Sequence, residues 1–408
     1  MLPNHSLYLH IPFCVHRCAY CDFNTYAGQQ NLIPAYVHAL SNEINILRED
    51  APEKITLHTV FFGGGTPSLL NPDQFEQILS VIRASFDLVS NPEITIEANP
   101  GTCRPPALTE LRQLGINRLS LGVQSANTEE LHMLERNHDF FDVIDAFSWA
   151  RQAGFENINL DLIYGLPGQS LSTWQNTLKS ALKLNPDHIS AYALTLEHGT
   201  PFGHWSKRGM IPLPDPDLAA DMYEWASETL AGAGFRQYEI SNWSKAGLEC
   251  KHNLQYWRGL PYIAAGAGAH GYASGYRYSN VLRIKSYIER MEEPHKTSLE
   301  FPLTPATVNH HHQSRQDDMS EMMMTGLRLT REGVSPQTFR EKFGRELKDT
   351  YMVEIDELVN LGLLEWACDE QKYTGASNSE SDESAAPEIL RLTTRGRLLG
   401  NQVFVRFV

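Results

Sequence analysis

The 408-residue sequence has little cysteine, a deficit of positive charge and no long apolar run. It holds six cysteines, and residues 1–13 contain Asn4, His5 and Pro12 but no long apolar stretch, so we expect no export signal and no disulfide bonds. Lys and Arg number 34 against 49 Asp and Glu, a formal net charge of −15, which argues against a nucleic-acid partner. No segment approaches the ~20 apolar residues of a membrane span. These absences predict a soluble, cytoplasmic protein without a transmembrane segment.

Three of the six cysteines stand close together near the start of the chain. Cys14, Cys18 and Cys21 have C-x3-C-x2-C spacing in the run HIPFCVHRCAYCDF, on a loop expected after the apolar run Leu7–Ile11. Three thiolates at this spacing can hold one iron–sulfur cluster, and because four cysteines normally close such a cluster, one iron stays open to a small molecule. A zinc site is the alternative, and it would need a fourth ligand from a nearby histidine.

Strand-like and helix-like segments alternate up to about residue 195. Expected strands are Leu7–Ile11, Thr56–Phe62, Glu93–Glu97, Arg118–Val123, Asn157–Ile163 and His188–Tyr192. Expected helices are Pro34–Leu47, Pro72–Phe86, Pro105–Leu114, Asp139–Ala153 and Leu171–Leu184. These strand–helix units predict an α/β fold, a parallel sheet curled into a partial (β/α)6 barrel, with ligands at the C-terminal ends of the strands.

Glycines and polar side chains fall at those strand ends. The run FFGGGTP over 61–67 follows a strand, and its glycines let the backbone approach a ligand closely. Glu97, Gln124 and Asp161 end or lie in three further strands. One such residue alone is usually a satisfied polar group, but three at one mouth of a barrel indicate a common site.

The cysteine run resembles the signature of radical S-adenosylmethionine (SAM) proteins, in which SAM chelates the open iron. Together with GGGTP, the strand-end glutamate, LGVQS and DLIYGLPGQ in this order, it makes the chain similar to the family of oxygen-independent coproporphyrinogen III oxidase and its relatives. The resemblance implies a [4Fe–4S] cluster on the three cysteines and a bound SAM. The residues it assigns to SAM are Tyr8, Tyr20, Gly64, Gly65, Thr66, Glu97, Gln124, Arg136 and Asp161, with the glycines at the methionyl end and Asp161 on the ribose hydroxyls.

The sequence departs from the oxidase pattern in two places. The oxidase carries a further cysteine two positions after its third, where this chain has Phe23. It also carries a long extension before its first strand, whereas here that strand is expected from Leu7. Both departures weaken the prediction of oxidase chemistry.

Residues 252–257 read HNLQYW, an HNxxYW motif that resembles the signature of the haem chaperone branch of this family. His252 offers a nitrogen to haem iron, Asn253 could orient the imidazole, and Tyr256 and Trp257 offer flat apolar area to a porphyrin. Cys250 is a rival axial ligand. The alternative is that these aromatic side chains only pack in a core.

The C-terminal part changes pattern. From residue 313 short helices and two short strands predict a mainly helical, winged-helix-like domain, after a radical SAM core over 1–235 and a connecting region with the haem motif over 236–312. We expect the triplet His310, His311 and His312 to lie in a surface linker. The segment Gly375–Pro387 is acidic and of low complexity, which argues against a DNA-binding wing.

The expected function is that of a haem chaperone with a [4Fe–4S] cluster, SAM and haem, and no assigned catalytic residue. Its expected partners are haem and haem-acceptor proteins, with membrane-associated respiratory proteins as one class. Two alternatives stay open. One is a coproporphyrinogen III dehydrogenase that performs radical SAM oxidative decarboxylation, and the other is a radical SAM enzyme acting on another tetrapyrrole.

Overall fold

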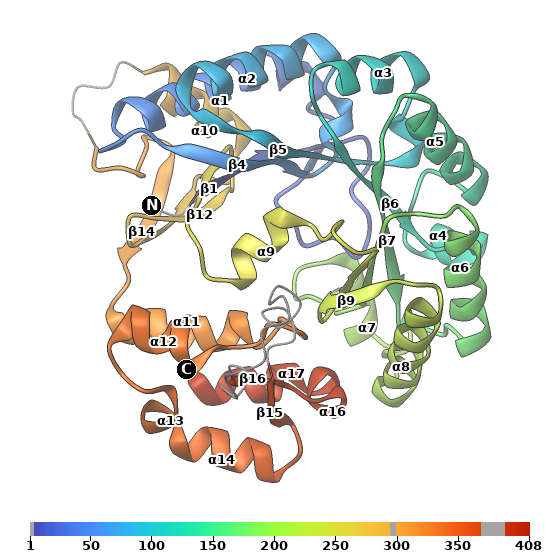
Figure 1. The fold of residues 1–408 in the computed structure, drawn as a ribbon. Coiled ribbons are helices and arrows are strands. Elements are labelled where there is room, and N and C mark those ends of the chain that lie inside the picture. Colours follow the sequence, from blue (N-terminus) through green and yellow to red (C-terminus); the bar gives the residue numbers. More distant parts are fainter. Residues whose placement is uncertain (1–3, 294–298, 369–387) are drawn as a thin grey trace, which may run out of the picture. The chain divides into compact units, whose positions relative to one another are not determined.

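The computed structural model describes residues 4–293, 299–368 and 388–408, which form two compact units (Figure 1). Unit 1 joins residues 1–232 to 261–312, and unit 2 joins 233–260 to 313–408. The connecting region expected over 236–312 is therefore divided near Pro261 between the two units.

Unit 1 is built on parallel strands that alternate with helices, as the expected partial barrel requires. The strands are β1 (His5–Ile11), β4 (Thr56–Gly64), β5 (Asp87–Ala98), β6 (Arg118–Gln124), β7 (Asn157–Tyr164) and β8 (His188–Ala193), each hydrogen-bonded to the next in parallel. The helices between them are α1 (Ile33–Glu49), α2 (Pro72–Ser85), α3 (Pro105–Gln113), α4 (Thr128–Met133), α5 (Phe140–Gln152) and α6 (Leu171–Lys183), and they cover the outer face of the curved sheet (Figure 1). The α/β fold class is confirmed.

Local sequence explains these elements. Side chains of β1 such as Leu7, Leu9 and Ile11 are fully buried, as is usual for parallel strands with both faces covered. Helix α2 begins with a capping box in which Asn71 and Gln74 satisfy each other's backbone amides, followed by a proline at the first helical position.

The sheet continues on the other side of β1. Strand β11 (Tyr262–Ala265) pairs with β1 in parallel, and β12 (His270–Ala273), β13 (Tyr276–Asn280) and β14 (Thr307–His312) follow in antiparallel order, with β14 at the end. The expected linker at the histidine triplet is therefore wrong. The triplet pairs with Tyr276–Tyr278 of β13, and because its side chains are exposed, it carries none of the apolar alternation that marks a strand in a sequence.

A buried carboxylate holds this added part of the sheet to α1. Each of the two carboxylate oxygens of Glu43 accepts two hydrogen bonds, and the side chain has no exposed surface. The donors are Gly266 N (2.7 Å), Asn280 Nδ2 (2.7 Å), Tyr287 Oη (2.6 Å) and Thr304 Oγ1 (2.8 Å). Tyr287 belongs to α10 (Ile284–Glu292), so one side chain joins two helices, the β11–β12 turn and β13. Unit 1 also includes β2 (Phe13–Cys14), β3 (Tyr26–Ala27), α7 (Pro201–Lys207) and α8 (Pro216–Gly232).

Unit 2 is mainly helical. It comprises β9 (Arg236–Glu239), β10 (Asn242–Ser244), α9 (Lys251–Trp257), α11 (Arg315–Gly326), α12 (Pro336–Phe343), α13 (Leu347–Thr350), α14 (Met352–Asn360), β15 (Leu364–Cys368), β16 (Glu388–Leu392), α16 (Thr394–Leu398) and α17 (Gly400–Phe404). The antiparallel pair β15–β16 and the helices enclose an apolar core that includes Phe339, Phe343 and Leu390. The C-terminal part thus has the expected winged-helix-like composition of helices and a strand pair, while Gly375–Pro387 lies outside the described residues.

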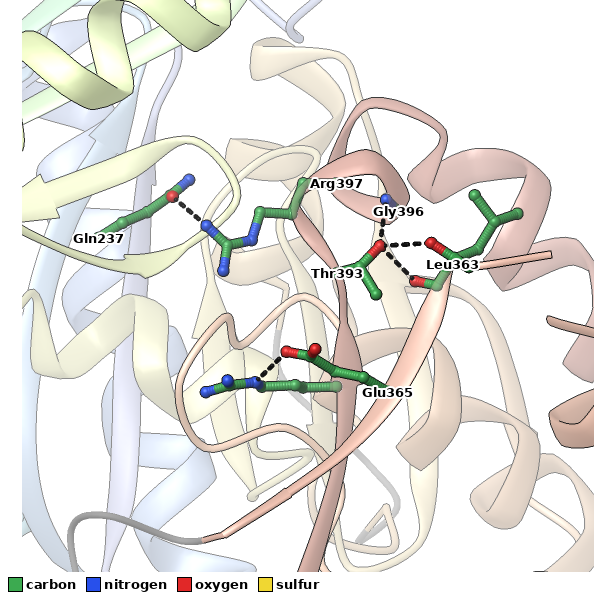
Figure 2. A network of polar contacts seen from close by, with 8 residues as sticks. Gln237, Leu363, Glu365, Thr393, Gly396 and Arg397 are labelled. Atoms are coloured by element: carbon green, nitrogen blue, oxygen red, sulfur yellow. Dashed lines mark hydrogen bonds and ion pairs between the residues drawn. The ribbon is translucent and has the colours of Figure 1, made fainter. Parts of the chain in front are cut away.

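Polar contacts fasten the last helices of unit 2 (Figure 2). The Thr393 hydroxyl caps α16 by accepting from Gly396 N at 2.9 Å, and it donates to the carbonyl of Gly362 at 2.7 Å. Arg397 on α16 donates to Oε1 of Gln237 on β9 at 3.0 Å. No helix among the described residues combines the length and the apolarity needed to cross a bilayer.

Candidate cluster and cofactor site

The cysteine loop joins two short strands next to β1. Cys14 ends β2, which pairs with β3, and the loop is closed by a hydrogen bond from Tyr26 N to the carbonyl of Pro12 at 2.7 Å. Cys14, Cys18 and Cys21 all line one cavity of about 390 Å³ at the C-terminal strand ends of unit 1. The structure therefore brings the three candidate ligands together.

Contacts from outside the loop fix its position. The carbonyl of Ala19 accepts from Phe202 N at 3.0 Å. Asn24 Nδ2 donates to the carbonyls of Ala267 and Leu282, each at 3.0 Å, and Asn24 O lies 2.9 Å from Nε2 of His10. The turn after β11 thus helps to place the cysteines. Asn24 packs closely against this turn, since a Cβ on Gly268 would lie 2.4 Å from the Asn24 side chain.

The surroundings of the thiols favour ligation by a cluster. Burial raises the pKa of the Cys14 and Cys21 thiols, so without a metal they stay protonated. Arg136 Nη1 lies 3.6 Å from Cys18 Sγ, so a guanidinium adjoins the third cysteine of the set. Over residues 4–293, 299–368 and 388–408, no three His, Cys, Asp or Glu side chains converge on a single metal ion. In a cluster each thiolate binds a different iron, so thiols spread around one cavity fit that group.

The glycine run at the end of β4 forms a second wall of the cavity. Gly64 has φ +114° and its N–H donates to Glu97 Oε2 at 3.0 Å. A Cβ on Gly65 would lie 2.6 Å from the carbonyl oxygen of Phe13, so only glycine fits between the strand end and the cysteine loop. The Thr66 hydroxyl donates toward Cys14 Sγ at 3.6 Å.

Two carboxyl groups, Glu97 on β5 and Asp161 on β7, line the same cavity, and β6 lies between their strands in the sheet. Burial, and secondarily the charge of Asp161, raises the pKa of Glu97 to about 7. Burial also raises the pKa of Asp161, while Ser120 Oγ donates to Oδ2 at 2.8 Å and Asn159 Nδ2 to Oδ1 at 2.9 Å. The pair presents acceptors to a ligand that carries hydroxyl and ammonium donors.

Gln124 and Arg136 complete the lining. Gln124 has φ +66°, a left-handed conformation that is costly for a residue other than glycine and is typical of functional sites. Arg136 Nη2 donates to Asn99 Oδ1 at 2.5 Å and to the carbonyl of Gly122 at 2.8 Å. The guanidinium is therefore held by two strand ends.

The two tyrosines that the resemblance assigns to SAM differ in position. Tyr20 lines the cavity, but Tyr8 does not: it stacks on Phe61 with ring centroids 6.2 Å apart, and its hydroxyl is 3.0 Å from Nδ1 of His10. Sequence reasoning also missed Asn99, which links Arg136 to Thr66 through a 3.0 Å hydrogen bond. Its place directly after the strand ending in Glu97 was the available signal.

The second set of candidate residues lies on α9 in unit 2. His252 is 1% exposed, and its Nε2 lies 2.8 Å from the Tyr256 hydroxyl, one helical turn later. Asn253 is half-buried in the same helix, and Cys250 is the fully buried residue before it. Trp257 is half-buried, with the Arg328 guanidinium 4.4 Å from its ring centroid. The motif thus joins an imidazole to two aromatic rings. Tyr256 already contacts the imidazole of His252, and Arg328 already covers one face of the Trp257 indole.

Comparison with known proteins places this arrangement in a family. Residues 8–181 match the radical SAM superfamily and residues 313–367 match the HemN C-terminal domain. The chain is 39% identical to the heme chaperone HemW of Bacillus subtilis, over 99% of each chain, and 36% identical to that of Lactococcus lactis, over 100% of this chain and 97% of the other. HemW of Escherichia coli is 43% identical over 66% of this chain and 70% of its own length. The structure of coproporphyrinogen III oxidase (HemN) from Escherichia coli superposes with a TM-score of 0.79 at 23% identity, covering 100% of this chain and 90% of that one, which shows a shared fold. The chain therefore belongs to the HemW-type members of the HemN-like radical SAM family.

Proposed function

We propose that this protein is a haem chaperone that binds a [4Fe–4S] cluster, SAM and haem, and delivers haem to acceptor proteins. The observation that carries the proposal is the presence of two separate ligand sets. Three thiols and two carboxyl groups line one cavity of unit 1, whereas the imidazole with two aromatic rings belongs to unit 2. A cluster suits the first set and a porphyrin suits the second.

Cys14, Cys18 and Cys21 would hold the cluster, and its iron without a protein ligand would accept SAM. When bound, this pair of cofactors supplies radical chemistry or, without cleavage, a structural and redox centre. Gly64, Gly65 and Thr66 would contact the methionyl end. Tyr20, Glu97, Gln124, Arg136 and Asp161 would surround the rest, with Asp161 accepting from the ribose hydroxyls.

His252 would bind haem iron, with Asn253, Tyr256 and Trp257 beside the porphyrin. Nε2 of His252 lies 2.8 Å from the Tyr256 hydroxyl, so haem iron bound at that nitrogen would replace this hydrogen bond. His252 is the one histidine in residues 233–260 and 313–408, and unit 2 therefore offers no second imidazole.

The proposal includes a cytoplasmic location, supported by six cysteines that are all free thiols. It also includes membrane-associated respiratory proteins as one class of acceptor, because these proteins need haem that a chaperone can supply. The competing function is the oxidative decarboxylation of coproporphyrinogen III. Phe23 argues against decarboxylation. The position that holds a cysteine in the oxidase carries an aromatic side chain here, which is 63% exposed and lines the cavity.

One experiment separates the two functions. The full chain is reconstituted anaerobically with iron, sulfide and SAM and then divided between two assays. We expect haem transfer to a haem-free b-type cytochrome, followed by absorbance, and no carbon dioxide released from coproporphyrinogen III. Decarboxylation without haem transfer would make the dehydrogenase the correct function.

A change at Asp161 is expected to weaken SAM binding. A hydrogen bond with one charged partner contributes roughly 1.5–3 kcal/mol, and about 1.4 kcal/mol corresponds to a tenfold change in affinity. Asp161→Ala should therefore weaken SAM binding at least about tenfold in equilibrium dialysis with the reconstituted protein. Thr177→Ala, a buried change on α6 outside the cavity lining, is the control. Equal affinity in the parent and Asp161→Ala would show that Asp161 does not contact SAM.

The pKa of Glu97 predicts a pH dependence of SAM affinity. Since the folded-state pKa is about 7, the carboxyl group ionises as the pH rises through 7, and its carboxylate is the better acceptor for the donors of SAM. The affinity should therefore rise between pH 6 and pH 8, and Glu97→Gln should flatten that part of the profile. The same raised pKa means that the ligand-free protein loses stability as the pH rises from the unfolded-state value to 7. An unchanged profile in Glu97→Gln would assign the dependence to another group.

A further inference from the structure

The histidine triplet lies in β14, the last strand of the sheet (Figure 1), and it places two imidazoles on one face of that strand. Side chains alternate between the faces of a strand, so His310 and His312 share a face and His311 occupies the other. The antiparallel register agrees, because His310 lies opposite Tyr278, His312 opposite Tyr276, and His311 opposite Arg277. All three histidines are exposed.

Ring contacts place both imidazoles beside Tyr276. The ring centroid of Tyr276 lies 5.0 Å from that of His312 and 6.2 Å from that of His310, with interplanar angles of 84° and 73°. Both imidazoles therefore adjoin the same phenol ring. The Tyr276 hydroxyl in turn donates to Glu300 Oε2 at 2.9 Å, which adds a negative charge on this side of the sheet.

We propose that His310 and His312 bind one late first-row divalent metal ion, of the class of Zn²⁺, Ni²⁺ and Cu²⁺. Imidazole is a preferred ligand of these ions, and a His-x-His pair on a strand directs two nitrogens to one side at the spacing of alternate residues. Each ring needs one nitrogen for the metal and keeps the other for hydrogen bonding. Within the described part of the chain no third His, Cys, Asp or Glu completes a closed site, so water fills the remaining positions. Such a site is open and exchangeable.

The ordinary explanation of a polar edge strand is protection against pairing with another chain. Exposed side chains on β14 serve that purpose whatever their type. Protection does not require imidazoles at two positions of one face beside a shared tyrosine, whereas metal binding does. The two explanations differ in what happens when the imidazoles are replaced by other polar groups.

His311 provides a matched control within the same strand. It has the same side chain and the same exposure class, but it lies opposite Arg277, whose guanidinium is 4.3 Å from the ring centroid of Tyr272. His311 is also the one histidine of the triplet on its face of the strand, so it has no second imidazole of the triplet beside it. A general affinity of surface histidines for metals would not distinguish His311 from its neighbours.

The test uses untagged, full-length protein with its cysteines occupied by a reconstituted cluster. Ni²⁺ and Zn²⁺ are titrated anaerobically by calorimetry into the parent and into His310→Gln, His311→Gln and His312→Gln. We expect one binding event in the parent. Its affinity should weaken at least about tenfold in the His310 and His312 variants, because losing even an indirect partner of a metal ligand has an effect of that size. The affinity should stay unchanged in the His311 variant. Equal affinities in all four proteins, or an equal loss in the His311 variant, would overturn the proposal.

A second titration separates metal ions from haem iron, which also takes imidazole. Hemin is added to the same four proteins and its Soret band is followed. We expect the same hemin affinity in all four, whether or not the haem chaperone function is correct. Loss of hemin binding with unchanged Ni²⁺ and Zn²⁺ binding in the His310 and His312 variants would overturn the metal site in favour of haem.

Discussion

Replacement of Cys18 by alanine is expected to abolish the [4Fe–4S] absorbance of the reconstituted protein. The chain supplies three thiolates at the cavity, so removing one leaves two irons without a protein ligand. Arg136 Nη1, 3.6 Å from Cys18 Sγ, would then lie next to the cluster without a thiolate to pair with. Cys14→Ala and Cys21→Ala should have the same effect. The measurement is iron and sulfide content together with the visible spectrum after anaerobic reconstitution.

Cys103 is the matched control for this prediction. It is a buried thiol that follows the end of β5, but it lies outside the cavity lining and faces the carbonyl of Asn99 at 3.6 Å. Cys103→Ala should keep full iron and sulfide content, as should Cys250→Ala and Cys368→Ala. A Cys18→Ala protein with a complete cluster would refute the ligand assignment, and a Cys103→Ala protein without one would extend it.

Replacement of His252 by alanine is expected to remove the haem Soret band and the transfer of haem. No other histidine occurs in residues 233–260 and 313–408, so the unit cannot substitute a second imidazole. The cluster spectrum should stay intact, because the cysteine cavity is lined by residues of unit 1. Hemin titration and transfer to a haem-free b-type cytochrome measure the effect, and added imidazole should restore part of the Soret band.

Two variants of α9 test the assignment from either side. Cys250→Ala should bind haem like the parent. Loss of haem binding in this variant would indicate that the Cys250 thiol is the ligand. Tyr256→Phe removes the hydroxyl that lies 2.8 Å from Nε2 of His252, and because this competitor for the nitrogen is gone, the variant should bind hemin at least as well as the parent. A His252→Ala protein that binds and delivers haem normally would show that the iron is held elsewhere. A parent protein that binds no haem would remove the chaperone proposal altogether.

Much of the fold could be predicted because its elements carry strong local signals. The six strands from β1 to β8 that form the barrel contain short β-branched or leucine-rich runs, and each intervening helix has an apolar face. The C-terminal helices were likewise visible in their spacing. The part of the sheet from β11 to β14 was not, because its strands are short, rich in Gly, Ala, Tyr and His, and have no apolar alternation. Their pairing depends on contacts with β1 and Glu43 far away in the sequence.

The candidate site could be predicted to a similar extent. The cysteines, the glycine run and the strand-end carboxyl groups line one cavity, since strand ends of a parallel barrel meet at one edge. Tyr8 lies in the middle of β1, where its ring packs on Phe61, so its assignment to SAM stays a prediction. The burial of His252 and its contact with Tyr256 could not be read from a motif, because a motif specifies residue types and leaves their rotamers undetermined.

The pairing of β1 with β11 has a consequence for synthesis of the chain. Ser6 pairs with Tyr262, so at about 5–20 residues per second the ribosome needs roughly 10–50 s to deliver the second strand after the first. During that time β1 has one open edge, and Glu43 lacks its donors from Gly266, Asn280, Tyr287 and Thr304. An open edge beside a buried apolar sheet is a template for aggregation. A nascent chain that has emerged only to the end of α8 therefore exposes this strand edge until β11 is made.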